Sequence, residues 1–145
     1  VAQLLPNAEI LVVTTPQQAA AEVAERTGLI ATQTHQKVVG VIENMSYMPQ
    51  PDGSRLEIFG SGGGQAVSES LSATLGYEVP LLAQLPLDIR LREGSDTGTP
   101  ATVADGGKPA ADAPAALELS RVAQQLGHVK RGLSGMRLGV SPVNS

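Results

Sequence analysis

The sequence has no cysteine and no tryptophan, and its aromatic residues are two tyrosines and one phenylalanine among 145 residues. Without cysteine, these residues can form no disulfide, supply no thiolate nucleophile and hold no metal or cluster through a thiolate. With so few aromatics, a core has to be built from Val, Leu, Ile and Ala. Because hydrophobic residues still make up 41% of the chain, we expect a folded globular unit.

Long apolar runs are missing as well. No stretch approaches the roughly 20 apolar residues that a membrane-spanning helix needs, and the chain does not open with a secretory signal pattern. We therefore expect a cytoplasmic protein without a membrane partner. The first residue is Val1 rather than Met, and the helix-like VAQLL runs straight into a buried-type strand, so we expect a chain cut from a longer one.

Basic residues are too few for a broad cationic surface. The net charge is -4, so nucleic acid is not an expected partner. The charge is uneven, because residues 128–145 hold Lys130, Arg131 and Arg137 and no acid. This end is either a solvated terminus or a cationic docking arm. We expect a basic, flexible tail over 128–145 after a domain over 1–127.

Catalytic and metal-ligand patterns are also missing. The two histidines, His35 and His128, accompany no nucleophile motif and no ligand spacing. We expect His35 to be structural, at the end of a helix over residues 17–34. No catalytic residue and no metal ligand is predicted within the chain.

The hydrophobic pattern of the first part predicts a strand, a helix and a strand. Residues 9–15 have a continuous apolar centre, which is typical of a strand covered on both faces. Pro16 ends this strand and suits an early helical position. A helix over 17–34, with Gly28 inside it, leads to a second buried-type strand over 37–42. This order is a βαβ unit, for which the crossover is right-handed.

The remainder continues the alternation. Residues 45–59 predict a turn-containing excursion or small hairpin. A helix over 65–75 ends at Gly76, and a strand over 79–85 ends at Pro86. Residues 95–114 are rich in Gly, Pro, Asp and Thr and predict a loop. A last helix runs to about residue 126, ended by Gly127, with Ala116, Leu119, Ala123 and Leu126 facing inward. The fold class is half of an α/β sheet.

A glycine-rich stretch, Gly60-Ser61-Gly62-Gly63-Gly64, lies between a possible strand and a helix. Such a turn presents backbone N–H groups that suit a phosphate. A phosphate loop of the Walker type also needs Gly-Lys-Ser/Thr, and no lysine follows here. A tight structural turn is the other interpretation, and the sequence leaves both open.

Polar residues follow two of the predicted strands. Asn44 lies at the carboxyl end of the strand over 37–42, and Pro86 and Asp88 follow the strand over 79–85. Ligands of open α/β sheets bind beyond the carboxyl ends of strands. Asn44 offers a donor and an acceptor that suit a purine edge, or it only caps the strand. Asp88 orders a loop, contacts a ligand or forms an exposed ion pair.

Together these stretches carry a resemblance. In order they are ILVVTTPQ (10–17), VVGVIENMS (38–46), IFGSGGG (58–64), PLLAQLPLD (80–88) and REGSDTGTP (92–100). The chain resembles the C-terminal half of the Mrp/ApbC family of P-loop ATPases, which are kin of the MinD/ParA group. The resemblance implies a mostly parallel sheet flanked by helices, a homodimer, and ATP bound and hydrolysed at the subunit interface. Many members carry a [4Fe–4S] cluster to apo iron–sulfur proteins.

By position, the resemblance implies that Asn44 contacts adenine and that Pro86 and Asp88 belong to the loop that closes over the base. Thr15 and Pro16 match the strand-end turn near the nucleotide. The family's GKGGVGKS loop and its Mg²⁺-organising aspartates are absent from this sequence and are expected upstream of residue 1. The chain by itself is therefore expected not to hydrolyse ATP, since phosphoryl transfer depends on positioned cations.

A second departure concerns the cluster. Many family members place Cys-x-x-Cys between the positions of Ser46 and Ile58, where this chain has YMPQPDGSRLE. A cluster bound through those thiolates is chemically excluded here. Three readings follow for the protein: an ATPase of iron–sulfur cluster assembly or delivery, a MinD/ParA-like ATP switch that positions a partner, and a non-enzymatic remnant.

Overall fold

The computed structural model describes residues 4–5, 7–17 and 19–130. Its sheet has helices on both faces, which confirms the predicted α/β class. The division into a domain over 1–127 and a tail stays a prediction, because residues 131–145 lie outside the described residues. The elements in chain order are β1 (Ile10–Thr14), α1 (Ala20–Thr34), β2 (Val38–Pro49), β3 (Arg55–Leu56), α2 (Gly63–Leu75), β4 (Leu81–Pro86), α3 (Ile89–Thr97) and α4 (Pro114–Lys130).

The sheet is built around β2. This strand pairs in parallel with β1 on one side and with β4 on the other. Its last residues run on past the sheet, and Met48 and Pro49 pair antiparallel with Leu56 and Arg55 of β3. The predicted hairpin is thus confirmed, and the strand that leads into it is longer than the sequence pattern indicates. The parallel part agrees with the mostly parallel sheet that was expected.

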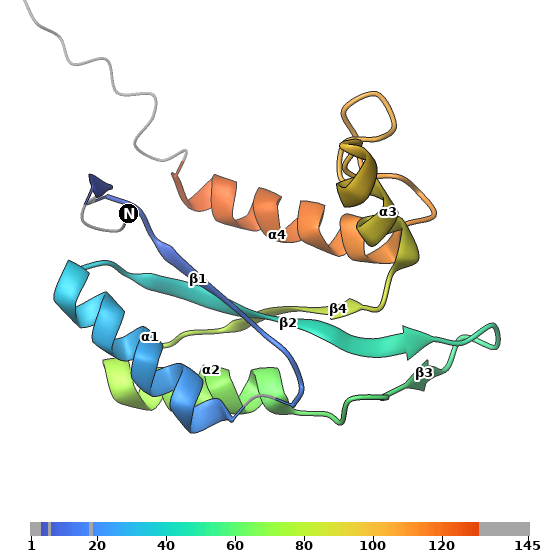
Figure 1. Ribbon diagram of the computed structural model, residues 1–145. Coiled ribbons are helices and arrows are strands. Elements are labelled where there is room, and N and C mark those ends of the chain that lie inside the picture. The colour runs from blue at the N-terminus through green and yellow to red at the C-terminus, as the bar shows by residue number, and fades with distance from the viewer. Residues whose placement is uncertain (1–3, 6, 18, 131–145) are drawn as a thin grey trace, which may run out of the picture.

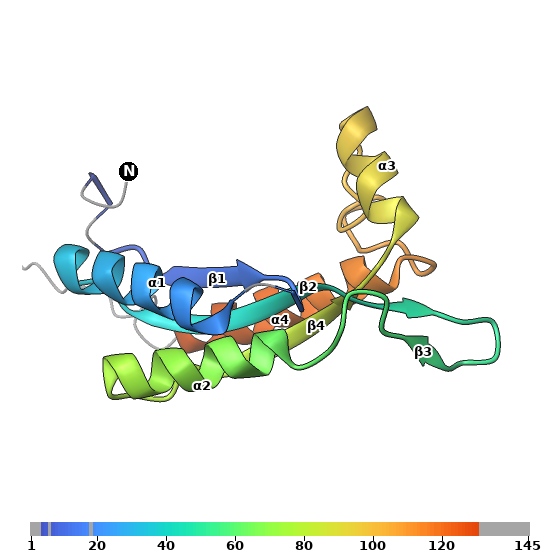
Figure 2. The same ribbon diagram turned by 60° about the horizontal axis from the view of Figure 1, so that its bottom comes forward.

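Helices α1 and α2 pack side by side on one face of the sheet, and α4 covers the other (Figures 1 and 2). Gly28, which was expected inside the first helix, lies where α1 meets α2, since a Cβ there would stand 3.0 Å from Thr74 Cγ2. The core on the first face consists of Val12, Ala24, Ala31, Val38, Val41, Val67, Leu71 and Val79. The core under α4 consists of Ile42, Leu82, Ala83, Leu85, Ala115 and Val122.

β1 is covered on one face only. Val12 and Thr14 are buried against the α1 and α2 side, whereas Leu11 is 37% exposed and Val13 is 60% exposed. Helix α4 packs on β4 and leaves this part of the sheet open. The expectation that this strand is covered on both faces is therefore wrong for the described residues.

The helices differ from the sequence prediction at several points, and α3 was not predicted. Helix α1 starts at Ala20, so Pro16 lies before the helix and not in its first turn. Helix α3 begins at Ile89 and extends into the segment predicted as loop. Helix α4 runs through Gly127 to Lys130, and its inward face uses Val122, while Ala123 is exposed.

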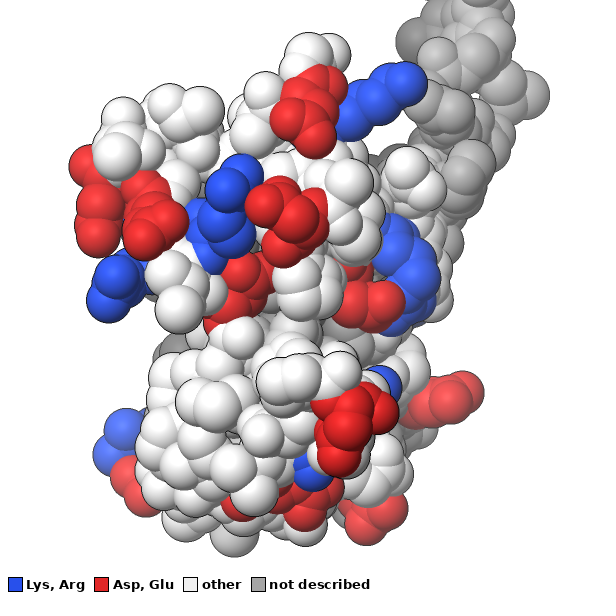
Figure 3. All heavy atoms as spheres, turned by 90° about the vertical axis from the view of Figure 1, so that its right-hand side faces the viewer, with Lys and Arg blue, Asp and Glu red and all other residues white. Residues whose placement is uncertain are grey.

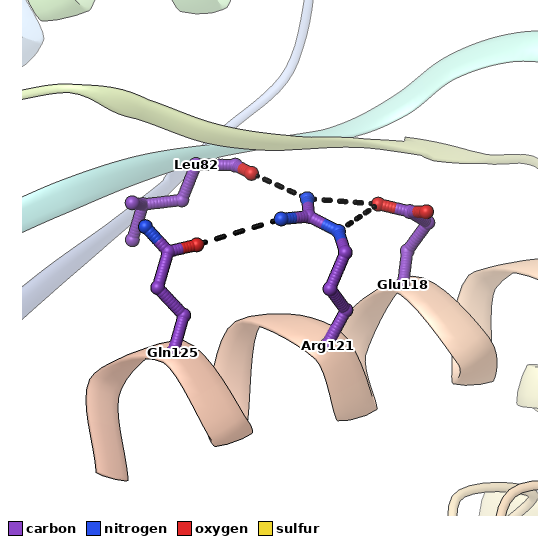
Figure 4. Close-up of polar contacts among 4 residues, drawn as sticks. All are labelled: Leu82, Glu118, Arg121 and Gln125. Atoms are coloured by element: carbon purple, nitrogen blue, oxygen red, sulfur yellow. Dashed lines mark hydrogen bonds and ion pairs between the residues drawn. The ribbon is translucent and has the colours of Figure 1, made fainter. Parts of the chain in front are cut away.

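Strand β4 departs from a regular ladder. The register shifts between Val41 and Ile42, which stand opposite Leu81 and Ala83, so Leu82 is the extra residue. Its carbonyl accepts a hydrogen bond of 2.7 Å from the Arg121 guanidinium of α4 (Figure 4). The same guanidinium is held by Glu118 and Gln125. A side chain of α4 thus satisfies a backbone group at the irregular point of β4.

At one end of the molecule, α3 and the β2–β3 hairpin diverge beyond the carboxyl ends of the parallel strands (Figures 1 and 2). Seen from this end, basic side chains are interspersed with acidic ones over the upper part, and the lower part has an uncharged area with acidic and basic side chains around it (Figure 3). Within the described residues, no helix combines the length and apolar character needed to cross a bilayer.

Candidate functional site

A pocket of about 360 Å³ lies at this end of the sheet. It is formed where the parallel pairing of β2 with β4 ends and α3 begins, so it occupies the position at which open α/β sheets bind ligands. Three of the five residues predicted for the site, Asn44, Pro86 and Asp88, meet in it. The lining residues are Asn44, Met45, Pro86, Leu87, Asp88, Leu91, Arg92, Ser95 and Asp96.

Asn44 lies within β2 and is half-buried. Its side-chain oxygen accepts a hydrogen bond of 2.9 Å from the N–H of Met45. Within the described part of the chain, the amide NH₂ of Asn44 donates to no partner. The local fold therefore fixes the acceptor of this side chain and leaves its donor free at the pocket.

Met45 has an unusual backbone. Its φ is 55°, in the left-handed region that non-glycine residues seldom adopt. Such residues are found mostly where the surrounding structure requires them, often at binding sites. Here the unusual turn falls between Asn44 and Ser46, and the side chain of Met45 lines the pocket. The register of β2 against β4 shifts here, between Glu43 and Tyr47, and the hairpin pairing begins at Met48.

Asp88 orders the loop after β4. One carboxylate oxygen accepts the N–H of Arg90 at 2.9 Å and caps α3, and the other accepts the N–H of Ala115 at 3.0 Å. Both oxygens are thus used by backbone donors, and Arg90 forms its ion pair with Asp112 instead. Of the roles that the sequence leaves open for Asp88, the structure favours ordering the loop. Pro86, buried at the end of β4, forms the pocket wall beside it.

Helix α3 supplies four pocket residues that the sequence pattern does not predict: Leu91, Arg92, Ser95 and Asp96. The signal that could have found them is the N-cap residue Asp88 followed by a helical turn. Thr15 and Pro16 do not join this pocket. The Pro16 carbonyl instead lies at the start of α2, where a Cβ on Gly63 would stand 2.5 Å from its oxygen.

The glycine-rich stretch forms a structural turn. Gly60 and Gly62 have positive φ values of 85° and 80°, and Gly62 is the N-cap of α2. The N–H of Gly64 donates to the carboxylate of Glu43, a fully buried residue of β2. An internal carboxylate already takes the position that a phosphate would need at this helix start, so the tight-turn interpretation is supported. Sequence reasoning gave Glu43 no role, although an acid inside a buried-type strand is itself a signal.

A second hollow of about 750 Å³ adjoins the pocket on the hairpin side. Its wall is largely apolar, with Met48, Pro49, Ile89 and Pro114, and it shares Met45, Leu87, Asp88 and Arg92 with the first pocket. Met45 therefore lies between the two. The surface around Asn44 continues without interruption toward the hairpin.

The β2–β3 hairpin lies in the stretch where the resemblance implies a Cys-x-x-Cys motif. It carries Tyr47 with the guanidinium of Arg55 over its ring, 4.2 Å from the ring centroid. The chain has no cysteine there or elsewhere. Among the described residues, no three His, Asp or Glu side chains gather as a metal site would require. These residues do not fit a thiolate-ligated cluster.

The chain is similar to several known proteins. An iron-sulfur cluster carrier protein from Mycobacterium leprae is 56% identical over 98% of this chain, and one from Mycobacterium tuberculosis is 52% identical over 98%. A protein of the same name from Synechocystis is 39% identical over 86% of the chain. The chain spans 36%, 36% and 33% of the lengths of these three relatives.

A solved nucleotide-binding protein from Archaeoglobus fulgidus, in complex with ADP, is 33% identical with a TM-score of 0.47, covering 61% of this chain and 35% of that one. The family described as the ParA-type NUBPL iron-transfer P-loop NTPase matches residues 1–126. The chain therefore belongs to the iron-transfer P-loop NTPase family, as the ordered motifs indicate.

Proposed function

We propose that this chain supplies the adenine-binding side of an ATPase that assembles or delivers iron–sulfur clusters. The observation that carries the proposal is the meeting of Asn44, Pro86 and the first turns of α3 in one pocket beyond the parallel strands. This is the general position of nucleotide sites in such sheets. The family to which the chain belongs supports the same reading.

The pocket has the chemistry that a purine requires. The free NH₂ donor of Asn44 suits a ring nitrogen acceptor, and its oxygen is held in place by the N–H of Met45. Apolar surface for the faces of a base comes from Pro86, Leu87 and Leu91. Asp88 contributes by holding the loop between β4 and α3 against the start of α4, so its effect on a ligand passes through the position of that loop.

These residues do not provide the means to hold or cleave a triphosphate. No Gly-Lys-Ser/Thr sequence occurs in the chain, and the N–H of Gly64 in the first turn of α2 is bound by Glu43. The phosphate loop and the Mg²⁺-binding residues of a working ATPase would come from a further part of the protein. The uncovered Leu11 and Val13 support this, because strands of parallel sheets are normally buried on both faces.

The proposal extends to the assembly and its partners. We further propose that the intact protein is a cytoplasmic homodimer that serves apo iron–sulfur proteins, as the family suggests. A second candidate function is an ATP-dependent switch that positions a protein partner without cluster chemistry. The specific observation in its favour is the β2–β3 hairpin, which has Tyr47, Met48 and Arg55 but no thiolate. Reconstitution of the full-length protein with iron and sulfide separates the two. Cluster binding and transfer to an apo-protein favour the carrier, and ATP-dependent association without a cluster favours the switch.

The adenine site is tested by titrating the 145-residue chain with ADP and GDP by calorimetry or NMR. We expect ADP to bind more tightly than GDP. Replacing Asn44 by Ala should weaken ADP binding by about 1–3 kcal/mol, since a buried hydrogen-bonding partner is lost. The matched control is Asn7→Ala at an exposed turn away from the pocket. Equal affinity of the Asn44→Ala variant and the parent would contradict the assignment, and so would the absence of any ADP binding.

A further inference from the structure

We propose that Glu43 is a positioning residue. Its buried carboxylate fixes the Asn44–Met45 turn and thereby sets the direction of the Asn44 NH₂ donor in the pocket. This rests on the proposed adenine site. Glu43 does not line the pocket, and its side chain points into the protein, where it is completely buried. Its influence on a ligand would pass through its neighbour in the chain.

The Glu43 carboxylate joins three parts of the fold. One oxygen accepts the N–H of Gly64, in the first turn of α2. The other accepts the hydroxyl of Ser46, later in β2, and the amide of Gln84 in β4 at 3.1 Å. The start of α2, the strand β4 and the far side of the Asn44–Met45 turn are therefore tied to one side chain.

The fit around the carboxylate is close. A Cβ on Gly64 would lie 2.7 Å from the Cβ of Glu43 and 3.0 Å from its Oε2, so this position requires glycine. No ion pair to Glu43 occurs within residues 4–5, 7–17 and 19–130. Its charge is balanced by hydrogen-bond donors and by the amino-terminal end of α2, which favours an anion.

Burying a carboxylate without a cation is costly, and an apolar residue of similar size fills a core position at lower cost. Packing alone therefore does not explain Glu43. What an apolar side chain could not do is bridge residues 43 and 46 across the turn between them. That turn contains Met45, whose left-handed φ of 55° needs support from its surroundings.

The Glu43–Ser46 hydrogen bond spans the two residues whose conformation defines the pocket edge. Asn44 and Met45 lie between the two bonded side chains, and the Asn44 oxygen is in turn bound to the Met45 N–H. With the ends of the turn fixed, the NH₂ of Asn44 has one direction in which to point. Without the bridge, Met45 is free to relax toward ordinary strand geometry and to carry Asn44 with it.

A simpler role for Glu43 is to cap α2 and nothing more. Ser46 distinguishes the two roles. Its hydroxyl donates to the Glu43 carboxylate and, among the described residues, forms no hydrogen bond with α2. If Glu43 only caps the helix, removing the Ser46 hydroxyl leaves Asn44 unaffected. If Glu43 positions Asn44, the variants Glu43→Gln and Ser46→Ala disturb the same group.

The experiment uses the 145-residue chain with Glu43→Gln, Ser46→Ala and the conservative Ser46→Thr. Matched controls are Glu78→Gln, at an exposed residue, and Ser120→Ala, on α4. Two readouts are taken for each folded variant: the NMR signal of the Asn44 side-chain NH₂ and the affinity for ADP. We expect Glu43→Gln and Ser46→Ala to shift or broaden the Asn44 signal and to weaken ADP binding about tenfold, with Ser46→Thr restoring both.

An unchanged Asn44 signal in Ser46→Ala would overturn the positioning role, even if Glu43→Gln lowers stability. Should Glu43→Gln fail to fold, the Ser46 pair decides the question. If the parent chain binds no ADP, the proposed adenine site fails on its own. The Asn44 signal then still accepts or rejects the role of Glu43.

Discussion

The carboxylate of Asp88 accepts a hydrogen bond of 3.0 Å from the backbone N–H of Ala115, 27 residues further along the chain. Its other oxygen caps α3 through the N–H of Arg90. One side chain thus accepts hydrogen bonds from backbone donors in the first turns of both α3 and α4. The loop between β4 and α3 and the start of α4 are thereby fixed relative to each other.

Replacing Asp88 by Ala should lower the free energy of unfolding by about 2 kcal/mol, because two backbone donors lose their acceptor and a single helix cap is typically worth about 1 kcal/mol. Asp88→Asn, which keeps one acceptor oxygen, should cost about half as much. Urea denaturation measures both. The control is Asp105→Ala in the exposed segment between α3 and α4, for which we expect a change below about 0.5 kcal/mol. An Asp88→Ala variant as stable as the control would contradict the double cap.

Arg121 has a comparable role for β4. Its guanidinium donates to the carbonyl of Leu82, the extra residue in the register shift, while Glu118 holds it from the helix side. The ion pair itself is about half exposed and contributes little. Most of the effect should come from the carbonyl that would lose its partner.

We expect Arg121→Ala to cost about 1 kcal/mol of unfolding free energy and Arg121→Lys somewhat less, since lysine lacks the planar group that reaches Leu82 and Glu118 together. The matched control is Arg26→Ala, which removes an exposed pair with Glu22 one turn away on α1 and should cost about 0.3–0.5 kcal/mol. Equal losses for Arg121→Ala and Arg26→Ala would show that the Leu82 contact is worth nothing in solution.

The tip of the hairpin carries a titration that can be followed directly. The pKa of Asp52 lies below its usual value, first because the Ser54 hydroxyl donates to its carboxylate at 2.6 Å and second because the Ser54 N–H does so at 2.9 Å. A lowered folded pKa means that the turn is supported above the unfolded value of 3.8 and loses this support as the pH falls through the folded pKa.

In an NMR titration we expect the Asp52 carboxyl to titrate below pH 3.8 and the Ser54 amide to shift with the same midpoint. Ser54→Ala removes the larger cause, so the midpoint should rise toward 3.8 while the backbone contact keeps part of the shift. A midpoint that does not move in Ser54→Ala would assign the lowered pKa to another cause.

Much of the fold was predictable because the signals are local. The apolar runs of β1 and β2, the αL glycine Gly76 after α2 and the prolines around β4 define elements without reference to the rest of the chain. The order of these elements then places the ends of β2 and β4 together. For this reason Asn44, Pro86 and Asp88 line one pocket, and their role in binding a ligand stays a prediction.

The errors come from interactions between distant residues. Helix α3 contains Gly94, Ser95 and Asp96, which are poor helix formers, and it depends on the cap from Asp88. Thr15 and Pro16 follow a strand end as Asn44 does, and the chain turns there toward the start of α2, so their expected place near the nucleotide stays a prediction. The role of Glu43 requires knowing that Gly64, Ser46 and Gln84 converge on it, and no local pattern contains that information.

Gly127 was wrongly predicted to end the last helix, and this error can be tested directly. A glycine near the end of a helical pattern predicts a C-cap with positive φ, where alanine would be strained. In the structure Gly127 lies inside α4, which continues to Lys130, and a Cβ at this position would meet no atom within 4 Å. Gly127→Ala should therefore raise the free energy of unfolding by about 0.5–1 kcal/mol, because alanine loses less backbone entropy in a helix.

Gly76→Ala, at a true left-handed cap with φ of 76°, is the paired variant and should lower stability. Thermal or urea unfolding compares the two, and a loss of stability in both variants would place the end of α4 at Gly127 after all.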